Sequence, residues 1–344
     1  MFNELLAWYN GLTDSLIGAL VLFAIGVVLL IKGGDWFVDS AVNIAKRFHV
    51  PEIIVGATIV SIGTTLPEVM VSVTAAVNNN GAIAYGNAIG SIICNTSLIA
   101  ALTIAIRPAP VDRKTIVTPV AFFFSSALIY IVAAYFFGRF ERVFGIILLL
   151  VFGVYMATTI YKGFKQPLQQ DAEQEDEAEL KKISIPKNLI LLAISAGLIA
   201  VGADMLEGSS VALATMAGIP TEVVGVTIVA LCTSLPELVT AVTALLKGHG
   251  ALSLGNIIGA NIFNLVLVSG AAVTISPFIV PEGSKLLGYN TSLLLEIPLM
   301  VVVMGLMTLP AIFKGKLQRW QGITLLGIYG CFVVLQVLIA VGAI

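Results

Sequence analysis

Long apolar stretches alternate with short polar ones along almost the whole chain, and this pattern predicts membrane-spanning helices. Each apolar stretch has about 20 residues or more, the length that crosses the hydrocarbon core of a bilayer as a helix. Polar residues together with proline and glycine separate the stretches, as in KRFHVP and RPAPVDRK. The pattern predicts ten helices, at residues 14–46, 52–78, 82–105, 115–137, 142–162, 187–216, 221–247, 251–274, 287–310 and 320–342.

Basic residues are distributed unevenly between the two sides of this arrangement. Fourteen of the 18 lie on one side, the other side has Arg139, Arg142 and Lys285, and Lys32 falls within a span. Because basic residues favour the cytoplasmic ends of spans, the richer side is predicted to be cytoplasmic, in a plasma (inner) membrane. Both termini are then outside, and the acidic segment 163–186 is a cytoplasmic linker between two sets of five spans. A regulatory cation site in this segment is the alternative, but charge runs are usually solvated.

Composition agrees with a polytopic membrane protein. Of the 344 residues, 58% are hydrophobic and 11% are charged, and the mean hydropathy is +1.02. Residues 1–30 contain no lysine or arginine, so we expect no cleavable signal peptide and a first apolar run that remains as a span. No basic face indicates a nucleic-acid partner. The cysteines, Cys94, Cys232 and Cys331, lie in apolar segments without the spacing of a disulfide or metal site.

The two halves of the chain are repeats of each other. VPEIIVGATIVSIGTTLPEVMVSVTAAV, from residue 50, aligns without a gap with IPTEVVGVTIVALCTSLPELVTAVTALL, from residue 219, and GNAIGSIICN then aligns with GNIIGANIFN. Because five is an odd number of spans, the second copy crosses the membrane in the opposite direction. We therefore expect an all-α polytopic membrane protein with inverted repeats at 1–162 and 187–344 and signature motifs at 56–95 and 225–264. Inverted repeats are typical of secondary transporters, with the substrate site near the bilayer midplane.

Each repeat contains a glutamate inside an apolar span, in GTTLPE (63–68) and in CTSLPE (232–237). An ionisable side chain at this depth costs at least about 2.5 kcal/mol and usually marks function. One such residue is readily interpreted as a hydrogen-bonded structural group. Two at equivalent positions, Glu68 and Glu237, favour a functional site. For Glu296, which has no counterpart in the other repeat, structural and functional roles both remain open.

The proline before each glutamate predicts a break in the helix. Pro67 and Pro236 have no N–H, so the carbonyls of Gly63 and Cys232 lose their helical partners. Hydroxyl groups stand beside the predicted breaks, on Thr64, Thr65, Thr233 and Ser234. Carboxylates, carbonyls and hydroxyls together supply the roughly 6–8 hard oxygen ligands that Ca²⁺ takes. The cluster contains no histidine or cysteine ligand, which argues against zinc or copper.

The spans that follow add further candidates. Ser91 and Asn95 lie four residues apart on one helical face, as do their counterparts Ala260 and Asn264, so each face can present oxygen atoms to the same cavity. Small residues four apart allow helices to approach closely. Close packing is therefore the interpretation of the glycine pairs, Gly86 with Gly90 and Gly255 with Gly259.

These motifs resemble the cation/Ca²⁺ antiporter superfamily, in particular its prokaryotic sodium/calcium exchanger-like branch. The resemblance covers essentially the whole chain. It implies that Glu68 and Glu237 are shared Ca²⁺ and Na⁺ ligands and that the carbonyls of Thr64 and Thr233 complete the calcium site. It also implies sodium ligands at Thr65, Ser234, Ser61, Ala230, Ser91 and Asn95, of which Ser61 and Ala230 act through their carbonyl oxygens.

The second copy departs from the family pattern. Many relatives have serine where Ala260 stands and an acidic residue where Asn264 stands. One hydroxyl ligand and one nearby charge are therefore missing. This difference leaves the number of sodium ions, and sodium itself as the coupling ion, open.

The expected function is exchange of Ca²⁺ for Na⁺ across the membrane by alternating access, without a cofactor. An H⁺-coupled divalent cation antiporter of the same fold is the alternative. An intramembrane hydrolase is disfavoured, because His49 and His249 lie in predicted loops and no other catalytic pair is evident. A passive channel would not require two carboxylate motifs in inverted copies. Stoichiometry and oligomeric state stay open.

Overall fold

The computed structural model describes residues 13–165, 183–218, 230–281, 285–286, 288–341 and 343. Three sequence predictions fall partly or wholly outside this set. The first concerns residues 1–12, for which we expected no cleavable signal peptide. The second concerns most of the acidic linker 163–186. The third concerns residues 221–229, which include the predicted start of the seventh span and of its motif at 225–264.

Residues 13–165 of the first half contain five span-length helical segments, three of which include a π-helical stretch. Their bounds are α2 (Leu16–Phe48), α3 (Glu52–Val55) with η1 (Gly56–Val60) and α4 (Ser61–Val77), α5 (Gly81–Cys94) with η2 (Asn95–Ala100) and α6 (Ala101–Ile106), α7 (Arg113–Ile131) with η3 (Val132–Phe136), and α8 (Arg142–Lys165).

The described part of the second half follows the same order. Its helices are α10 (Ile185–Met216), α12 (Ala230–Cys232), α13 (Leu235–Leu246), α14 (Gly250–Phe263) with η6 (Asn264–Val268) and α15 (Ser269–Ile275), η7 (Ser292–Glu296) with α16 (Ile297–Lys314), and α17 (Arg319–Ala340). Nine helices among the described residues are long and apolar enough to span a membrane, and α12 with α13 is the described part of the remaining one. The fold is thus the expected ten-helix inverted repeat.

The predicted start of the ninth span, residue 287, is wrong. The helical segment begins at Ser292, because the residues before it include a short hairpin of β3 (Lys285–Leu286) and β4 (Tyr289–Asn290). Gly288 lies between these strands with φ +83°, a backbone conformation that glycine adopts readily.

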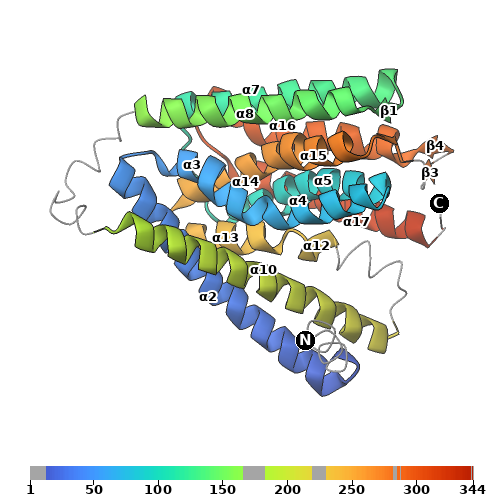
Figure 1. The fold of residues 1–344 in the computed structure, drawn as a ribbon, viewed down its shortest axis with the longest axis horizontal. Coiled ribbons are helices and arrows are strands. Elements are labelled where there is room, and N and C mark those ends of the chain that lie inside the picture. Colours follow the sequence, from blue (N-terminus) through green and yellow to red (C-terminus); the bar gives the residue numbers. More distant parts are fainter. Residues whose placement is uncertain are drawn as a thin grey trace.

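The helices that carry the repeated motifs lie in the middle of the molecule. Figure 1 shows α4, α5, α13 and α14 at the centre, with α7 and α8 on one side and the crossing pair of α2 and α10 on the other. The pair approaches backbone to backbone, because a Cβ added to Gly26 would lie 2.9 Å from the carbonyl oxygen of Gly202. The α14–α15 span is the most buried and α17 is the most exposed, so α17 is a lipid-facing helix.

The loops that connect the spans pair with one another, and these pairings show which span ends lie on the same side of the molecule. The connection before α8 contains β1 (Arg139–Phe140), which pairs with β2 (Phe278–Ile279) after α15. At the other ends of the spans, Pro110 forms a β-bridge with Lys316. These pairings bring together connections that the distribution of basic residues assigned to the same side of the membrane.

Ion pairs link the two halves at the end of the molecule that is rich in basic residues. Lys247, at the end of α13, contacts Asp39 at 2.8 Å and Asp35 at 3.3 Å, both on α2. Partial burial lowers the pKa of Lys247, but the hydrogen bonds and charges of the two aspartates offset this effect, and the pKa lies above its usual value. His249 Nδ1 lies 2.8 Å from Glu52 Oε1. Both predicted loop histidines therefore lie outside the centre of the bundle, with His49 at the C-terminal cap of α2.

Candidate ion-binding site

The two motif glutamates are brought together at the centre of the bundle. Glu68 on α4 is 1% exposed, and Glu237, in the first turn of α13, is 0% exposed. The helices that carry them, α4 and α13, contact each other. Glu237 Oε1 accepts a hydrogen bond from Thr65 Oγ1 at 3.4 Å. Within the described residues, Glu237 Oε2 and both carboxyl oxygens of Glu68 have no hydrogen-bond partner.

Four more of the sequence-predicted residues are buried with polar atoms that lack partners. Within the described part of the chain, no hydrogen bond satisfies the side-chain polar atoms of Ser91, Asn95, Ser234 and Asn264. Folded proteins satisfy the large majority of such groups, and an unpaired buried charge is more costly still. A bound cation would neutralise the carboxylates and use unpaired oxygen atoms as ligands, so the pattern favours an ion site made of oxygen atoms.

A shared irregularity of the backbone positions the two asparagines. Asn95 begins η2 and Asn264 begins η6, so the same α-to-π transition occurs at equivalent residues of the two repeats. Single-turn π-helical insertions are often found at functional sites. Ala260, at the position equivalent to Ser91, is fully buried and supplies no side-chain oxygen.

The predicted helix break occurs in one repeat only. In the second repeat, α12 ends at Cys232 and α13 begins at Leu235, so the chain breaks before Pro236 as expected. In the first repeat the prediction is wrong, because α4 continues through Pro67. Proline removes one hydrogen bond, and in spans neighbouring helices and hydroxyl side chains compensate for this loss. The irregular backbone of this span lies earlier, in η1.

The remaining predicted ligands lie around these segments. Thr64 and Thr65 are buried on α4, Thr233 is half-buried in the turn before α13, and Ala230 begins α12. Ser61 Oγ donates to the Gly56 carbonyl at 2.8 Å. Because this hydroxyl is already bonded to the backbone, a role for Ser61 through its own carbonyl oxygen remains the better interpretation.

Two asparagines that were not predicted hold the site in place. Asn256 Oδ1 accepts a hydrogen bond from Thr64 Oγ1 at 3.3 Å, and its Nδ2 donates to Thr240 Oγ1 at 2.9 Å. Asn87 Nδ2 donates to the Glu68 carbonyl at 3.0 Å. They are the asparagines of GNAIG and GNIIG. The sequence did contain a signal for them, because an asparagine stands between two glycines at the same position of each repeat.

The glycine packing prediction holds in the second repeat. A Cβ on Gly255 would lie 2.1 Å from the Ile53 carbonyl oxygen, and one on Gly259 would lie 2.3 Å from Ser61 Oγ. A Cβ added to Gly86 or Gly90 would have no contact within 4 Å among the described residues. No packing partner of this pair is seen among the described residues, so this half of the prediction stays untested.

A recess connects the motif prolines with the outer helix pair. Its volume, including the open space at its mouth, is about 180 Å³, and it is lined by residues of α2, α4, α10 and α13. These residues are Phe37, Gly63, Thr64, Pro67, Ala196, Ile199, Ala200 and Pro236. The recess therefore reaches one of the predicted calcium ligands, Thr64, from the side of α2 and α10.

The chemistry of the donor set points to a hard cation. Nowhere in the described ranges do three His, Cys, Asp or Glu side chains gather as a metal-binding group. The candidate ligands are two carboxylates together with hydroxyl, amide and carbonyl oxygens. Oxygen ligands without nitrogen or sulfur suit Ca²⁺ better than zinc or copper.

Comparisons with known proteins identify similar sequences over most of the chain. The model of a family described as sodium/calcium exchanger protein matches residues 18–161 and 187–338. An uncharacterized membrane protein of Methanocaldococcus jannaschii is 34% identical over 310 residues, which cover 89% of this chain and 94% of the relative. Sodium/calcium exchanger MaX1 of Methanosarcina acetivorans is 29% identical over 348 residues, which cover 91% of this chain and 97% of MaX1.

A solved structure has the same fold. One structure of the sodium-calcium exchanger NCX_Mj, soaked with Na⁺ and Sr²⁺, superposes with a TM-score of 0.77 at 30% sequence identity. The match covers 93% of this chain and 99% of that chain.

Proposed function

Because the chain belongs to the sodium/calcium exchanger protein family, we propose that it exchanges Ca²⁺ for Na⁺ across the membrane by alternating access. The observation that carries this proposal is the pair of buried glutamates, Glu68 and Glu237, which have three carboxyl oxygens without a hydrogen-bond partner among the described residues. The relative MaX1 and the structural neighbour NCX_Mj are both named as sodium/calcium exchangers.

The proposed calcium site contains both carboxylates and the carbonyl oxygens of Thr64 and Thr233. The two negative charges of Glu68 and Glu237 balance one Ca²⁺. The neighbouring sodium sites add Thr65, Ser234, Ser91, Asn95 and Asn264, together with the carbonyls of Ser61 and Ala230. Binding of the two ions is competitive, because both require Glu68 and Glu237.

The neutral residue at 264 limits how many sodium ions the site can hold. Two Na⁺ neutralise Glu68 and Glu237, and a third Na⁺ would leave a net charge of +1 because Asn264 has none. Burying an uncompensated charge is costly. This chain is therefore proposed to exchange fewer than three Na⁺ for each Ca²⁺, or to bind the third sodium ion weakly.

The proposed membrane orientation follows the basic residues. Both termini lie outside, and the linker 163–186 joins the repeats 1–162 and 187–344 on the cytoplasmic side. The pairing of Pro110 with Lys316 and of His249 with Glu52 supports this grouping of connections. Labelling of single cysteines introduced at Lys165 and Arg139, with an impermeant reagent on intact cells, tests it. Labelling at 165 without labelling at 139 would reverse the orientation.

The decisive experiment is flux of ⁴⁵Ca²⁺ into vesicles that contain the purified protein. A Na⁺ gradient alone, an H⁺ gradient alone and no gradient are compared. Uptake driven by the Na⁺ gradient supports the proposal, and uptake driven only by the H⁺ gradient assigns the H⁺-coupled alternative. Uptake of equal rate in all three conditions would identify a passive pathway and refute exchange.

A further inference from the structure

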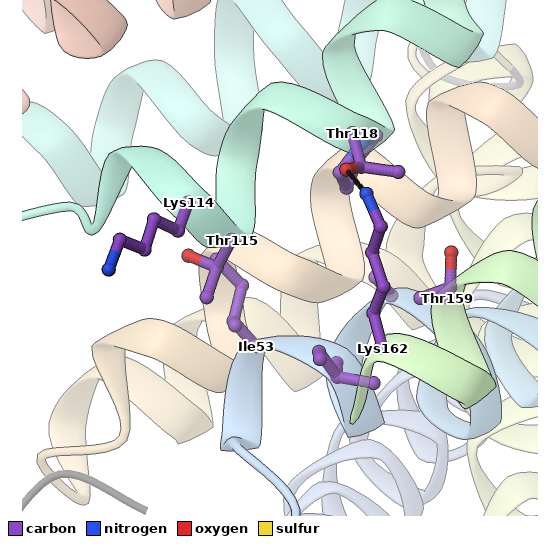
Figure 2. A pocket seen from close by; sticks show the side chains of 9 residues that line it. Ile53, Lys114, Thr115, Thr118, Thr159 and Lys162 are labelled. Atoms are coloured by element: carbon purple, nitrogen blue, oxygen red, sulfur yellow. Dashed lines mark hydrogen bonds between the residues drawn. The ribbon is translucent and has the colours of Figure 1, made fainter. Parts of the chain in front are cut away.

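A second recess lies away from the glutamates, where the start of α3 meets α7 and α8. Its volume, including the open mouth, is about 340 Å³. Figure 2 shows the side chains that line it: Ile53, Ile54, Ala57, Lys114, Thr115, Thr118, Pro119, Thr159 and Lys162. The recess combines an apolar floor, made by Ile53, Ile54, Ala57 and Pro119, with two lysines and three hydroxyl groups.

Within the part of the chain that the structure describes, no carboxylate forms an ion pair with the two lysines of the recess. Lys162 extends from α8 and donates to Thr118 Oγ1 at 2.7 Å, while Lys114 leaves the first turn of α7 with its ammonium directed outwards (Figure 2). Neither lysine takes part in any ion pair between described residues. The nearest acidic residue in sequence, Asp112, instead caps α7 by accepting from the Lys114 backbone N–H at 2.9 Å. The recess therefore has a net positive charge.

A buried hydroxyl group in the recess lacks a partner. Thr159 is 4% exposed, and its Oγ1 makes no hydrogen bond to any residue that the structure describes. By contrast, Thr115 Oγ1 donates to the Asp112 carbonyl at 2.8 Å. An unpaired hydroxyl at a buried position costs free energy, which a bound acceptor would recover. The Lys162 ammonium and this hydroxyl belong to the lining, and Lys114 adds a second positive charge at the edge of the recess, a combination that suits a ligand with negatively charged oxygen atoms.

We infer that this recess binds the phosphate group of an anionic phospholipid. Phosphate accepts several charge-assisted hydrogen bonds, and lysine is a common phosphate ligand. The recess lies at the ends of two spans on the side with most basic residues, where basic pockets between helices bind anionic headgroups. The rest of its lining is apolar, with Ile53, Ile54, Ala57 and Pro119, which suits the carbon atoms next to a lipid phosphate better than free phosphate.

The recess is next to the backbone that leads into the ion site. Ala57 lies in η1, four residues before Ser61, and its carbonyl accepts a hydrogen bond from Tyr155 Oη at 3.2 Å. A headgroup between α7, α8 and α3 would hold η1 against α8. Occupancy is therefore expected to stabilise the protein and to influence the mobility of the motif helix.

The test measures lipid binding to the full-length protein in detergent by native mass spectrometry. Phosphatidylglycerol, phosphatidylcholine and inorganic phosphate are added separately to the wild type, to K114Q/K162Q, to T159V and to the control K314Q/K316Q. The control removes two exposed lysines from the same side of the molecule, outside the recess. Two lysines near an anionic headgroup are together worth about thirtyfold in affinity.

We expect one phosphatidylglycerol to bind selectively to the wild type and the control, with about thirtyfold weaker binding in K114Q/K162Q and a smaller loss in T159V. Selective binding of inorganic phosphate, lost in K114Q/K162Q, would retain the phosphate site but overturn the lipid as its source. Equal phosphatidylglycerol binding by K114Q/K162Q and K314Q/K316Q would overturn the site. So would equal binding of phosphatidylcholine and phosphatidylglycerol by the wild type.

Discussion

Replacement of Asn256 by alanine separates the stability of the bundle from the geometry of the ion site. The Asn256 side chain makes one short hydrogen bond, to Thr240 at 2.9 Å, and one long one, from Thr64 at 3.3 Å. After the substitution, Ser61 still donates to Gly56 and Thr240 still donates to Pro236. With a net value of about 0.5–1.5 kcal/mol for each hydrogen bond, we expect a loss of about 1–2 kcal/mol in unfolding free energy.

Gln321 provides a matched control. Its amide donates to the Leu306 and Met307 carbonyls at 2.9 and 3.0 Å and accepts from the Gln318 N–H at 2.9 Å. The Leu306 carbonyl needs this donor, because Pro310 has no N–H to offer four residues later. Gln321→Ala therefore removes three short bonds and should cost about 2–4 kcal/mol. None of these hydrogen bonds involves a residue of the ion site.

The expected outcomes are opposite for stability and for ion binding. Gln321→Ala should lower the melting temperature in detergent more than Asn256→Ala does. Asn256→Ala should instead weaken the apparent Ca²⁺ affinity in vesicle flux by about tenfold, equivalent to about 1.4 kcal/mol, because Thr64 loses the bond that orients it. Gln321→Ala should leave the affinity unchanged. If Ca²⁺ affinity falls in proportion to melting temperature in both variants, Asn256 is not a positioning residue for the site.

Four further outcomes are expected. Glu68→Gln and Glu237→Gln should each abolish Ca²⁺ exchange while the protein remains folded, because the amide keeps the volume and removes a charge; wild-type ⁴⁵Ca²⁺ flux in either would contradict the shared site. Ca²⁺ binding, measured by calorimetry, should weaken as pH falls from about 7.5 to about 5.5, since a proton on either carboxylate removes charge from the site; a flat profile would refute this. Asn264→Asp should shift ion competition towards Na⁺ or add a pH-dependent step, whereas Asn264→Ala should lose only an oxygen ligand. If the flux of both variants depends on ions in the same way as that of the wild type, Asn264 lies outside the ion pathway. Gly259→Ala should destabilise the protein by about 1–3 kcal/mol, because the new Cβ would lie 2.3 Å from Ser61 Oγ. The control is Gly330→Ala on the lipid-facing α17. A melting temperature that is unchanged in Gly259→Ala would show that the helices separate without cost.

Local properties of the sequence were sufficient to predict the spans and the chemistry of the site. Span length and apolar composition are imposed by the bilayer, so nine predicted spans correspond to the nine long apolar helices of the described residues. The repeat identified equivalent positions in both halves without any structure. Buried groups such as Glu68, Asn95 and Asn264 were recognisable because polar residues are costly within apolar spans.

The tertiary structure decided how those residues are supported. Helix α4 continues through Pro67, whereas the chain breaks before Pro236, although the two prolines occupy equivalent positions in the repeats. The partners of Asn256 lie on α4 and α13, and no spacing along the chain reveals such contacts. The cationic recess likewise combines Lys114 and Lys162 from separate helices. Sequence periodicity records burial along each helix, whereas hydrogen-bond partners and cavities depend on which helices pack together.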